Sequence, residues 1–262
     1  MYTVTAPAKI NIFLKITGHK NGYHTLLSRF VQVPQLYDTL TFVQADTSEF
    51  SIEGCDGVAL QDNSVYKAYQ ALKKATQSRD LQTFFSTHKV RIAKRIPSGA
   101  GLGGGSSDAA AFLRLANDVC NLRLDTPTLA RIGASVGADV PFFVYDLPSA
   151  NVSGFGEIIE AFDETPPTLT VHTPPIHCDT ADVYKTFKRH LLSSVDTQTF
   201  KGWEKERSAA LLERIGDAKR LNDLYAAALL CYPELAQTRE AKEGWFFSGS
   251  GSSFFTLKEG EK

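Results

Sequence analysis

Apolar and β-branched residues dominate the first third of the chain, in short runs bounded by polar and turn-forming residues. This pattern predicts β-strands, because such side chains fit a half-buried pleated surface. The expected strands cover residues 10–16, 26–33, 39–43, 50–52 and 90–93. The segment 34–38, Pro-Gln-Leu-Tyr-Asp, carries turn residues, so it predicts a turn between two of these strands.

Helical spacing of apolar residues begins near residue 63. Asn63 is a suitable N-cap for a helix that reaches residue 75, and Thr126 followed by Pro127 predicts the start of a helix that reaches residue 136. Further helices are expected at residues 106–120, 180–189, 208–215, 221–230 and 233–241, and strands at 141–145, 150–153, 157–161, 169–172, 245–248 and 253–257. Strands and helices are mixed without regular β-α-β alternation, which favours an α+β fold over a doubly wound sheet.

Composition narrows the class of protein. The 262 residues carry 28 basic and 29 acidic side chains, a formal charge of −1, which gives no reason to expect nucleic acid or an anionic membrane as a partner. Four scattered cysteines without a C-x-x-C pair disfavour a zinc site and favour the cytoplasm. The sequence predicts neither a signal peptide nor a membrane span. Segment 163–167, Asp-Glu-Thr-Pro-Pro, predicts a linker between domains of residues 1–162 and 163–262.

The strongest local signal is a glycine-rich segment, with five glycines in the seven positions 99–105, directly before a predicted helix. Glycine lets backbone N–H groups approach an anion, and a helix N-terminus adds free N–H groups and a positive dipole end. We therefore predict a phosphate-binding loop. A flexible linker or tight turn is the alternative. The segment lacks the Gly-Lys-Ser/Thr of a Walker A loop and the β-α-β setting of a dinucleotide fold.

Three segments together resemble the motifs of the GHMP kinase superfamily, in the family's order and spacing. They are residues 6–14 (Ala-Pro-Ala-Lys-Ile-Asn-Ile-Phe-Leu), the glycine-rich segment at 96–110 and residues 247–253 (Phe-Ser-Gly-Ser-Gly-Ser-Ser). The resemblance implies transfer of the γ-phosphoryl of ATP to an alcohol, with Mg²⁺. It also implies an N-terminal domain similar to domain 2 of ribosomal protein S5 and a ferredoxin-like C-terminal domain, shortened at its C-terminal edge.

Further residues resemble one branch of the superfamily, whose substrate carries a cytidine diphosphate group and belongs to the non-mevalonate route to isoprenoid precursors. They are Gly22-Tyr23-His24, Leu36-Tyr37-Asp38, the doubled Ser106-Ser107, and residues 137–143. The resemblance thus implies a small-molecule substrate as partner. We expect a monomer or weak homodimer in the cytoplasm.

Two charged residues are candidates for the chemistry itself. Asp139 stands among small residues at the start of an apolar segment, and Lys9 lies within an apolar β segment; such charges are unusual unless they are paired. An ammonium beside the carboxylate would lower its pKa and stabilise a developing alkoxide. The resemblance implies the same pair, with Asp139 as general base. From the residues alone, surface charges or a structural ion pair are equally good interpretations.

The resemblance also assigns binding residues. The candidates for ATP are Pro97, Gly99, Ala100, Gly101, Leu102, Gly103, Gly104, Gly105, Ser106, Ser107, Asn63, Ser64, Lys94 and Asp108, and Ser107 is also the candidate Mg²⁺ ligand. The candidates for the substrate are Asn11, Tyr23, His24, Thr173 and His177, with Tyr23 and His177 stacking on the cytosine. Ser248, Gly249 and Gly251 are expected to form a second backbone wall. Helix capping for Asn63, an ordinary loop histidine for His24 and a plain hairpin turn near 250 are the alternatives.

Two other functions stay open from the sequence. A GHMP kinase for a different alcohol, such as homoserine or mevalonate, is disfavoured by Tyr23 and His24, which suit a base-bearing substrate. A nucleotide or metabolite sensor on the same fold is disfavoured because the chain keeps both Lys9 and Asp139.

Overall fold

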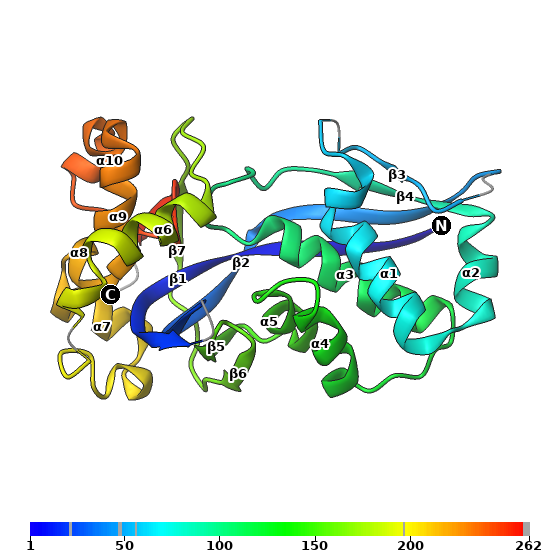
Figure 1. Ribbon diagram of the computed structural model, residues 1–262, viewed down its shortest axis with the longest axis horizontal. Helices are drawn as coiled ribbons and strands as arrows, with labels where there is room; N and C mark the ends of the chain where they lie inside the picture. The colour runs from blue at the N-terminus through cyan, green and yellow to red at the C-terminus, as the bar shows by residue number, and fades with distance from the viewer. Residues whose placement is uncertain (21–22, 47–48, 56, 196, 259–262) are drawn as a thin grey trace. The chain divides into compact units, whose positions relative to one another are not determined.

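The computed structural model describes residues 1–20, 23–46, 49–55, 57–195 and 197–258 (Figure 1). It divides into two compact units built from separate stretches of chain. Unit 1 comprises Met1–Ala8, Pro34–Ile96 and Gly103–Leu147, and unit 2 comprises Lys9–Val33, Pro97–Leu102 and Pro148–Lys262. The mixture of helices and sheets confirms the α+β class. The domain boundary expected after residue 162 stays a prediction.

Two long strands contribute to both units, β1 (Tyr2–Lys20) and β2 (Tyr23–Gln44), which pair with each other. Residues 39–44 of β2 run antiparallel to β4 (His88–Ala93), and residues 26–31 run antiparallel to β5 (Ser149–Gly154). The predicted turn at 34–38 is therefore wrong, because β2 continues through it. Pro34 falls between the stretches that pair with β4 and β5, so its missing N–H removes no bond to either strand.

Unit 1 packs helices against its part of the sheet. Figure 1 shows α1 (Ser64–Thr76) beside α3 (Gly104–Val119). The other elements are β3 (Ile52–Glu53), which runs parallel to β4, α2 (Arg79–Phe85), α4 (Thr126–Ala134) and α5 (Val140–Tyr145). The predicted N-cap is confirmed, since the Asn63 side chain accepts from the N–H of Val65. Helix α2 was not predicted from the sequence.

The short helix α5 corrects another prediction, because residues 141–145 were expected to form a strand. Val140 to Val144 are all buried, so the segment reads as a continuous apolar run with no visible helical period. Such a run does not distinguish a buried strand from a buried helix turn. Pro141 lies in the first turn of α5, where a missing N–H costs nothing, so the helix is the better local solution.

Unit 2 contains β5, β6 (Ile158–Ala161) and a second antiparallel sheet in the order β7 (Leu169–His172), β9 (Phe254–Leu257), β8 (Phe246–Phe247). Its helices are α6 (Thr180–His190), α7 (Ser208–Ile215), α8 (Ala218–Leu221), α9 (Asp223–Cys231) and α10 (Arg239–Lys242). Helix α6 packs on α9 (Figure 1). The helix predicted at 233–241 is only partly correct. Its first part is a 3₁₀ turn, Pro233–Gln237, and α10 covers only its last residues, after Thr238, whose side chain caps α10.

A buried arginine organises the inner part of unit 2. Arg29 on β2 is fully buried, and its guanidinium lies 3.3 Å from the centre of the Phe162 ring. Its Nε donates to Asn151 Oδ1 at 2.7 Å, and one terminal nitrogen lies 3.5 Å from Glu164. Glu164 in turn accepts from the backbone N–H of Ser208 at 2.8 Å. The network joins β2, β5, the segment after β6 and the start of α7.

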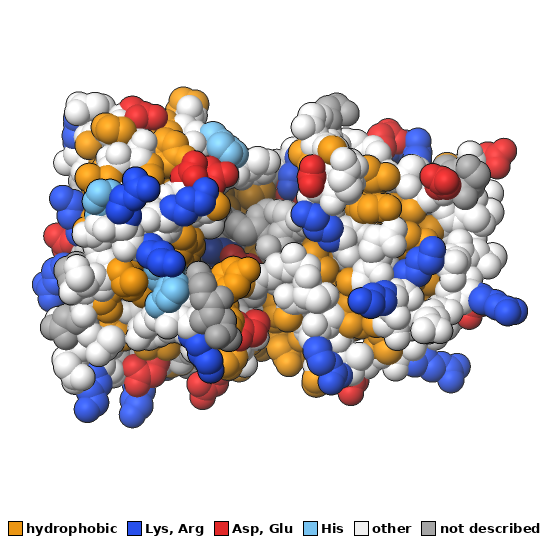
Figure 2. Space-filling model, viewed as in Figure 1, with side chains coloured by type: hydrophobic (Ala, Val, Ile, Leu, Met, Phe, Trp, Pro, Cys, Tyr) orange, Lys and Arg blue, Asp and Glu red, His pale blue; other side chains and the backbone are white. Residues whose placement is uncertain are grey.

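No helix in the described ranges combines the length and apolar character needed to cross a bilayer. On the face drawn in Figure 2, lysine and arginine side chains are interspersed with aspartate and glutamate.

Candidate active site

Lys9 and Asn11 lie on β1 within unit 2 and are almost completely buried. The Lys9 ammonium donates to Asn11 Oδ1 at 2.7 Å and lies 4.4 Å from the centre of the Phe30 ring. The backbone N–H of Lys9 donates to the carbonyl of Leu102, at the end of the loop segment 97–102, at 2.9 Å. The structure therefore brings the first motif and the beginning of the second together.

The third motif joins them through Ser248. The backbone N–H of Asn11 donates to Ser248 Oγ, and that hydroxyl donates to the carbonyl of Gly101, both at 3.2 Å. Gly101 has φ +72°, and a Cβ there would lie 2.2 Å from the Ser248 carbonyl oxygen. Gly249 has φ +58°, and a Cβ there would lie 3.2 Å from the Cα and the carbonyl oxygen of Gly101. Both positions thus require glycine for their backbone angles and for the approach of one loop to the other.

A residue outside the motifs holds this arrangement, and the sequence analysis did not identify it. Asn222 is buried, and its amide donates to the carbonyls of Phe247 and Gly249 at 3.0 and 2.8 Å. Its Oδ1 accepts from the N–H of Leu224 and so caps α9. The sequence analysis started the helix at residue 221, and the fitness of asparagine as an N-cap would have marked Asn222 only as a helix start, not as a partner of the third motif.

Two predicted substrate residues, Thr173 and His177, lie against the same loops. A Cβ on Gly99 would lie 2.2 Å from His177 Cε1, so the imidazole packs directly against that glycine. The Thr173 hydroxyl lies 2.7 Å from the Ser253 hydroxyl. Ala100 lies alongside, because its carbonyl accepts from the N–H of Ser253 at 3.1 Å.

Tyr23 and His24 begin β2 and have different surroundings; the preceding Asn21 and Gly22 lie outside the described residues. Tyr23 is 69% exposed, and its ring lies 5.9 Å from that of Phe155. His24 is buried, 5.5 Å from the Tyr184 ring on α6. Burial lowers the pKa of His24, with smaller effects of His19 and Lys188, so the neutral imidazole is favoured. Its Nε2 has no hydrogen-bond partner within the described ranges.

Two of the predicted nucleotide residues, Lys94 and Asp108, meet in unit 1 together with Asp38. The Lys94 ammonium lies 2.5 Å from Asp38 Oδ2 and 2.7 Å from Asp108 Oδ2. Asp38 is fully buried, and its other oxygen accepts from the N–H groups of Arg95 and Ile96. The sequence analysis noted Asp38 as part of a family pattern without giving it a role.

Asp108, near the start of α3, is the member of this cluster with unmet hydrogen-bonding capacity. Burial raises the pKa of Asp108 from 3.8 to about 7, while Lys94 opposes the shift and Asp38 adds to it. Its Oδ1 and the adjacent Ser107 Oγ are buried and meet no hydrogen-bond partner among the described residues. Buried polar atoms are normally satisfied by protein groups, water or a bound ligand, so these two oxygens are candidate ligand contacts.

The remaining predicted residues of unit 1 surround the start of α3. This helix has Gly103 as N-cap at φ +71°, so the N–H groups of the following residues are available to an anion. A Cβ on Gly105 would lie 3.1 Å from Ser64 Oγ. A Cβ on Gly137 would lie 3.7 Å from Ser106 Oγ, which places the segment leading to Asp139 beside the glycine-rich helix start. Asp139 itself precedes α5 as its N-cap residue.

Cys55 lies close to the cluster of Lys94, Asp38 and Asp108, and the sequence analysis did not predict this. The Cys55 side chain is hydrogen-bonded to Asn63 and lies within electrostatic range of Asp108 and Lys94; burial raises the pKa of the Cys55 thiol. It is half-buried. Sequence spacing gave no signal for Cys55, because β3 and α1 bring it to the cluster through the fold.

Mg²⁺ would find few protein ligands here. Across the described residues, no group of three or more His, Cys, Asp or Glu side chains is arranged to hold a metal ion. The unpartnered Ser107 hydroxyl fits a single ligand position, with phosphate and water oxygens supplying the others.

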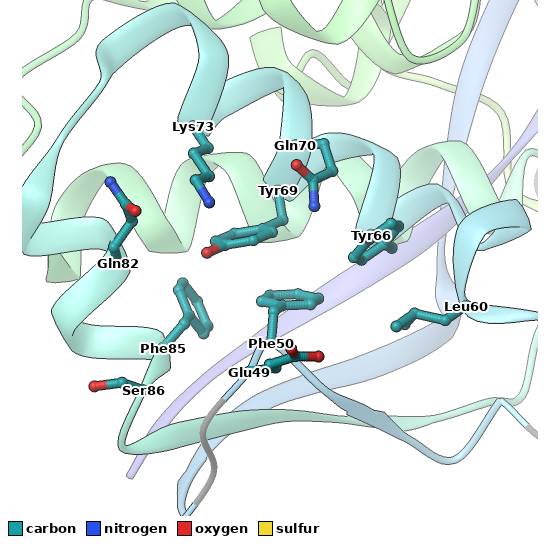
Figure 3. A pocket seen from close by; sticks show the side chains of 10 residues that line it. All are labelled: Glu49, Phe50, Leu60, Tyr66, Tyr69, Gln70, Lys73, Gln82, Phe85 and Ser86. Atoms are coloured by element: carbon teal, nitrogen blue, oxygen red, sulfur yellow. The ribbon is translucent and has the colours of Figure 1, made fainter.

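Unit 1 also holds a cavity of about 360 Å³ that none of the predicted site residues lines (Figure 3). Phe50 and Tyr69 stack at 4.1 Å in its wall, and Phe85 lies 5.1 Å from Phe50. Lys73 and Gln70 reach it from α1. The cavity is therefore separate from the clusters described above.

Comparisons with known proteins agree with this architecture. The model of the GHMP kinases N terminal domain matches residues 63–146. A protein of Sulfurovum sp. (strain NBC37-1) called 4-diphosphocytidyl-2-C-methyl-D-erythritol kinase is 56% identical over 99% of this chain and 100% of its own. A crystal structure of 4-(cytidine 5'-diphospho)-2C-methyl-D-erythritol kinase is similar with a TM-score of 0.70 and 30% identity, over 99% of this chain and 91% of that one.

More distant similarity extends to the fold alone. A crystal structure of mevalonate kinase has a TM-score of 0.65 with 13% identity, over 98% of this chain and 91% of that one. The Sulfurovum protein, 56% identical over 99% of this chain, shows the family of this chain as well as its fold. The chain therefore belongs to the 4-diphosphocytidyl-2-C-methyl-D-erythritol kinases, a family of small-molecule kinases within the GHMP kinases.

Proposed function

We propose that this protein transfers the γ-phosphoryl group of ATP to the 2-hydroxyl of 4-diphosphocytidyl-2-C-methyl-D-erythritol, in the non-mevalonate route to isoprenoid precursors. The observation that carries the proposal is the near full-length, 56% identity to a relative with that name. The packing of the three motifs in unit 2, through Lys9, Asn11, Ser248 and Gly101, supports it.

In this proposal the backbone of residues 97–105 and the start of α3 bind the phosphates of ATP. Phosphoryl transfer depends mainly on positioning and charge neutralisation, so backbone N–H groups at a helix start are suited to it. Ser107 contributes its hydroxyl to Mg²⁺. When bound, Mg²⁺ neutralises charge on the phosphate oxygens. Asn63, Ser64, Lys94 and Asp108 bind the adenosine part; the buried, unpartnered Asp108 Oδ1 is consistent with a polar contact there.

Asp139 accepts the proton of the attacking hydroxyl, and Lys9 stabilises the developing charge on its oxygen. The burial of Lys9 and its hydrogen bond to Asn11 suit this role, because a fixed ammonium needs little reorganisation during the reaction. Asn11 and Thr173 contact the methylerythritol or its diphosphate.

Tyr23, His24 and His177 bind the cytosine. Tyr23 has the open ring face that stacking requires, since it is 69% exposed. A neutral His24 imidazole, favoured by burial, retains one donor and one acceptor nitrogen for a base edge. The free state of all four cysteines supports a reducing compartment, so we place the enzyme in the cytoplasm as a monomer or weak homodimer.

A coupled ADP-release assay with several alcohols tests the proposal. We expect turnover with the cytidine diphosphate substrate and none with homoserine or mevalonate. Turnover with either of those would assign another GHMP kinase activity, and nucleotide binding without turnover would assign a sensor. Asp139→Asn and Lys9→Ala are each expected to lower kcat by about 10²–10⁴-fold, the usual contribution of a positioned acid or base. Near-normal rates in both variants would remove these catalytic assignments.

A further inference from the structure

Ser28, a residue outside the three motifs, lies directly behind the pair formed by Lys9 and Asn11. It is fully buried on β2. Its hydroxyl lies 2.5 Å from the carbonyl oxygen of Phe13 and 2.9 Å from Asn11 Nδ2. All four residues belong to unit 2.

The direction of these hydrogen bonds follows from the number of protons available. A serine hydroxyl has a single proton, and a carbonyl oxygen accepts but never donates. The Ser28 proton is therefore used on the Phe13 carbonyl, which leaves Ser28 Oγ as an acceptor toward Asn11. Only the NH₂ end of the Asn11 amide satisfies an acceptor.

This fixes which end of the Asn11 amide faces Lys9. With Nδ2 donating to Ser28, Oδ1 points to the Lys9 ammonium at 2.7 Å. A flipped amide would place two acceptors together at Ser28 and two donors together at Lys9. Because Asn11 is 1% exposed, water does not offer either end another partner. Ser28 thus selects the orientation in which Asn11 accepts from Lys9.

The strand that carries Ser28 is itself fixed. The next residue, Arg29, points to the opposite face of β2, where Asn151 and Glu164 hold its guanidinium. Ser28 therefore has little freedom to follow a displaced Asn11.

We propose that Ser28 is a positioning residue for Lys9, acting through the orientation of the Asn11 amide. The inference rests on the proposed function, in which Lys9 stabilises the reacting oxygen. Its effect belongs to the chemical step more than to nucleotide binding.

The test measures kcat and KM by ADP release from the full-length protein with ATP and 4-diphosphocytidyl-2-C-methyl-D-erythritol. Ser28→Ala is expected to lower kcat by about 10–100-fold, the effect of losing a hydrogen bond that orients a charged group, with KM for ATP changed less than about 3-fold. On an Asn11→Ala background, Ser28→Ala is expected to add no further loss, because the link to Lys9 is already broken.

Ser28→Thr and Ser28→Val form the matched pair. Both introduce a β-branched side chain of nearly the same shape at a fully buried site, but only threonine keeps the hydroxyl. We expect threonine to retain at least about 10-fold more kcat than valine at equal melting temperature. This pair also decides the question if Ser28→Ala does not fold. Ser86→Ala is the control, since the Ser86 hydroxyl also donates to a backbone carbonyl, that of Thr83 at 2.8 Å, at the end of α2 in unit 1; its kcat should stay within about 2-fold of wild type.

The outcomes distinguish a failure of the proposed role of Ser28 from a failure of the proposed kinase function. Wild-type turnover together with equal rates for the threonine and valine variants would overturn the role of Ser28 and leave the proposed function standing. Additive losses for Ser28→Ala and Asn11→Ala would overturn it as well. Absence of wild-type turnover with the cytidine diphosphate substrate would overturn the proposed function, and the role of Ser28 with it.

Discussion

Removal of the Asp108 charge should make the free protein less sensitive to pH. Asp108 shares Lys94 with Asp38, so two carboxylates meet one ammonium in a buried cluster. Its pKa in the folded state is about 7, against 3.8 for the ordinary carboxyl. Between these values the folded protein binds a proton at Asp108 that the unfolded chain does not.

The sign of the effect follows from this difference. Because the folded-state pKa is raised, the stabilising contribution is fully present below about pH 4 and is lost as the pH rises through 7. A shift of about three pH units corresponds to roughly 4 kcal/mol, at 1.36 kcal/mol per unit, and about half of that is lost between pH 5.5 and 8.5. Asp108 is 3% exposed, so solvent screening reduces this little. Asp108→Asn should abolish that part of the pH dependence.

The assay is thermal or urea unfolding of the nucleotide-free full chain at pH 5.5, 6.5, 7.5 and 8.5. Wild type should lose roughly 2 kcal/mol of stability across this range from Asp108 alone, and Asp108→Asn should be flatter by that amount. Asp118→Asn, an exposed position on the same helix, is the control and should follow wild type. Parallel pH profiles for wild type and Asp108→Asn would refute the raised pKa and the charge imbalance that we infer for the cluster.

Two other substitutions test features of unit 2. Gly101→Ala should destabilise the protein by about 1–3 kcal/mol and reduce turnover, because of φ +72° and the close Ser248 carbonyl. Gly202→Ala is the control: it introduces the same unfavourable positive φ, +92°, but its Cβ meets no atom within 4 Å, so it should destabilise the protein less. Equal losses of stability in urea unfolding would show that contact with the Ser248 carbonyl contributes nothing at Gly101. Arg29→Met should cost about 3–5 kcal/mol by leaving the Glu164 carboxylate buried without its cation, and adding Glu164→Gln should restore part of that loss in the same measurement.

Local signals predicted most of the secondary structure, and the failures have common causes. Strand 169–172 and helix 208–215 match β7 and α7 in full, because their periodicity and flanking polar residues agree. The turn at 34–38 failed because pairing on both sides of Pro34 overrides its local preference. Residues 141–145 failed because complete burial removes the contrast between faces on which periodicity depends.

The candidate site was predictable where it consists of glycines and motif residues, and unpredictable where it depends on tertiary contacts. Gly101 and Gly249 were named from the sequence, and both take positive φ. Ser28, Asn222 and Tyr184 were not named, since their contacts to Asn11, Gly249 and His24 join segments far apart in the chain. A single sequence carries no pattern that marks such long-range partners.

The double use of Asn222 has a consequence for how related chains are compared. One amide both starts a helix and fixes two carbonyls of the closing glycine-serine turn. Consider a homologue with an identical turn sequence but with aspartate in place of this asparagine. It would keep the helix start, because a carboxylate also caps a helix, but it would lose both hydrogen-bond donors to the turn. Sequence scoring confined to the turn would rate two such chains as equivalent although one of them had lost its support.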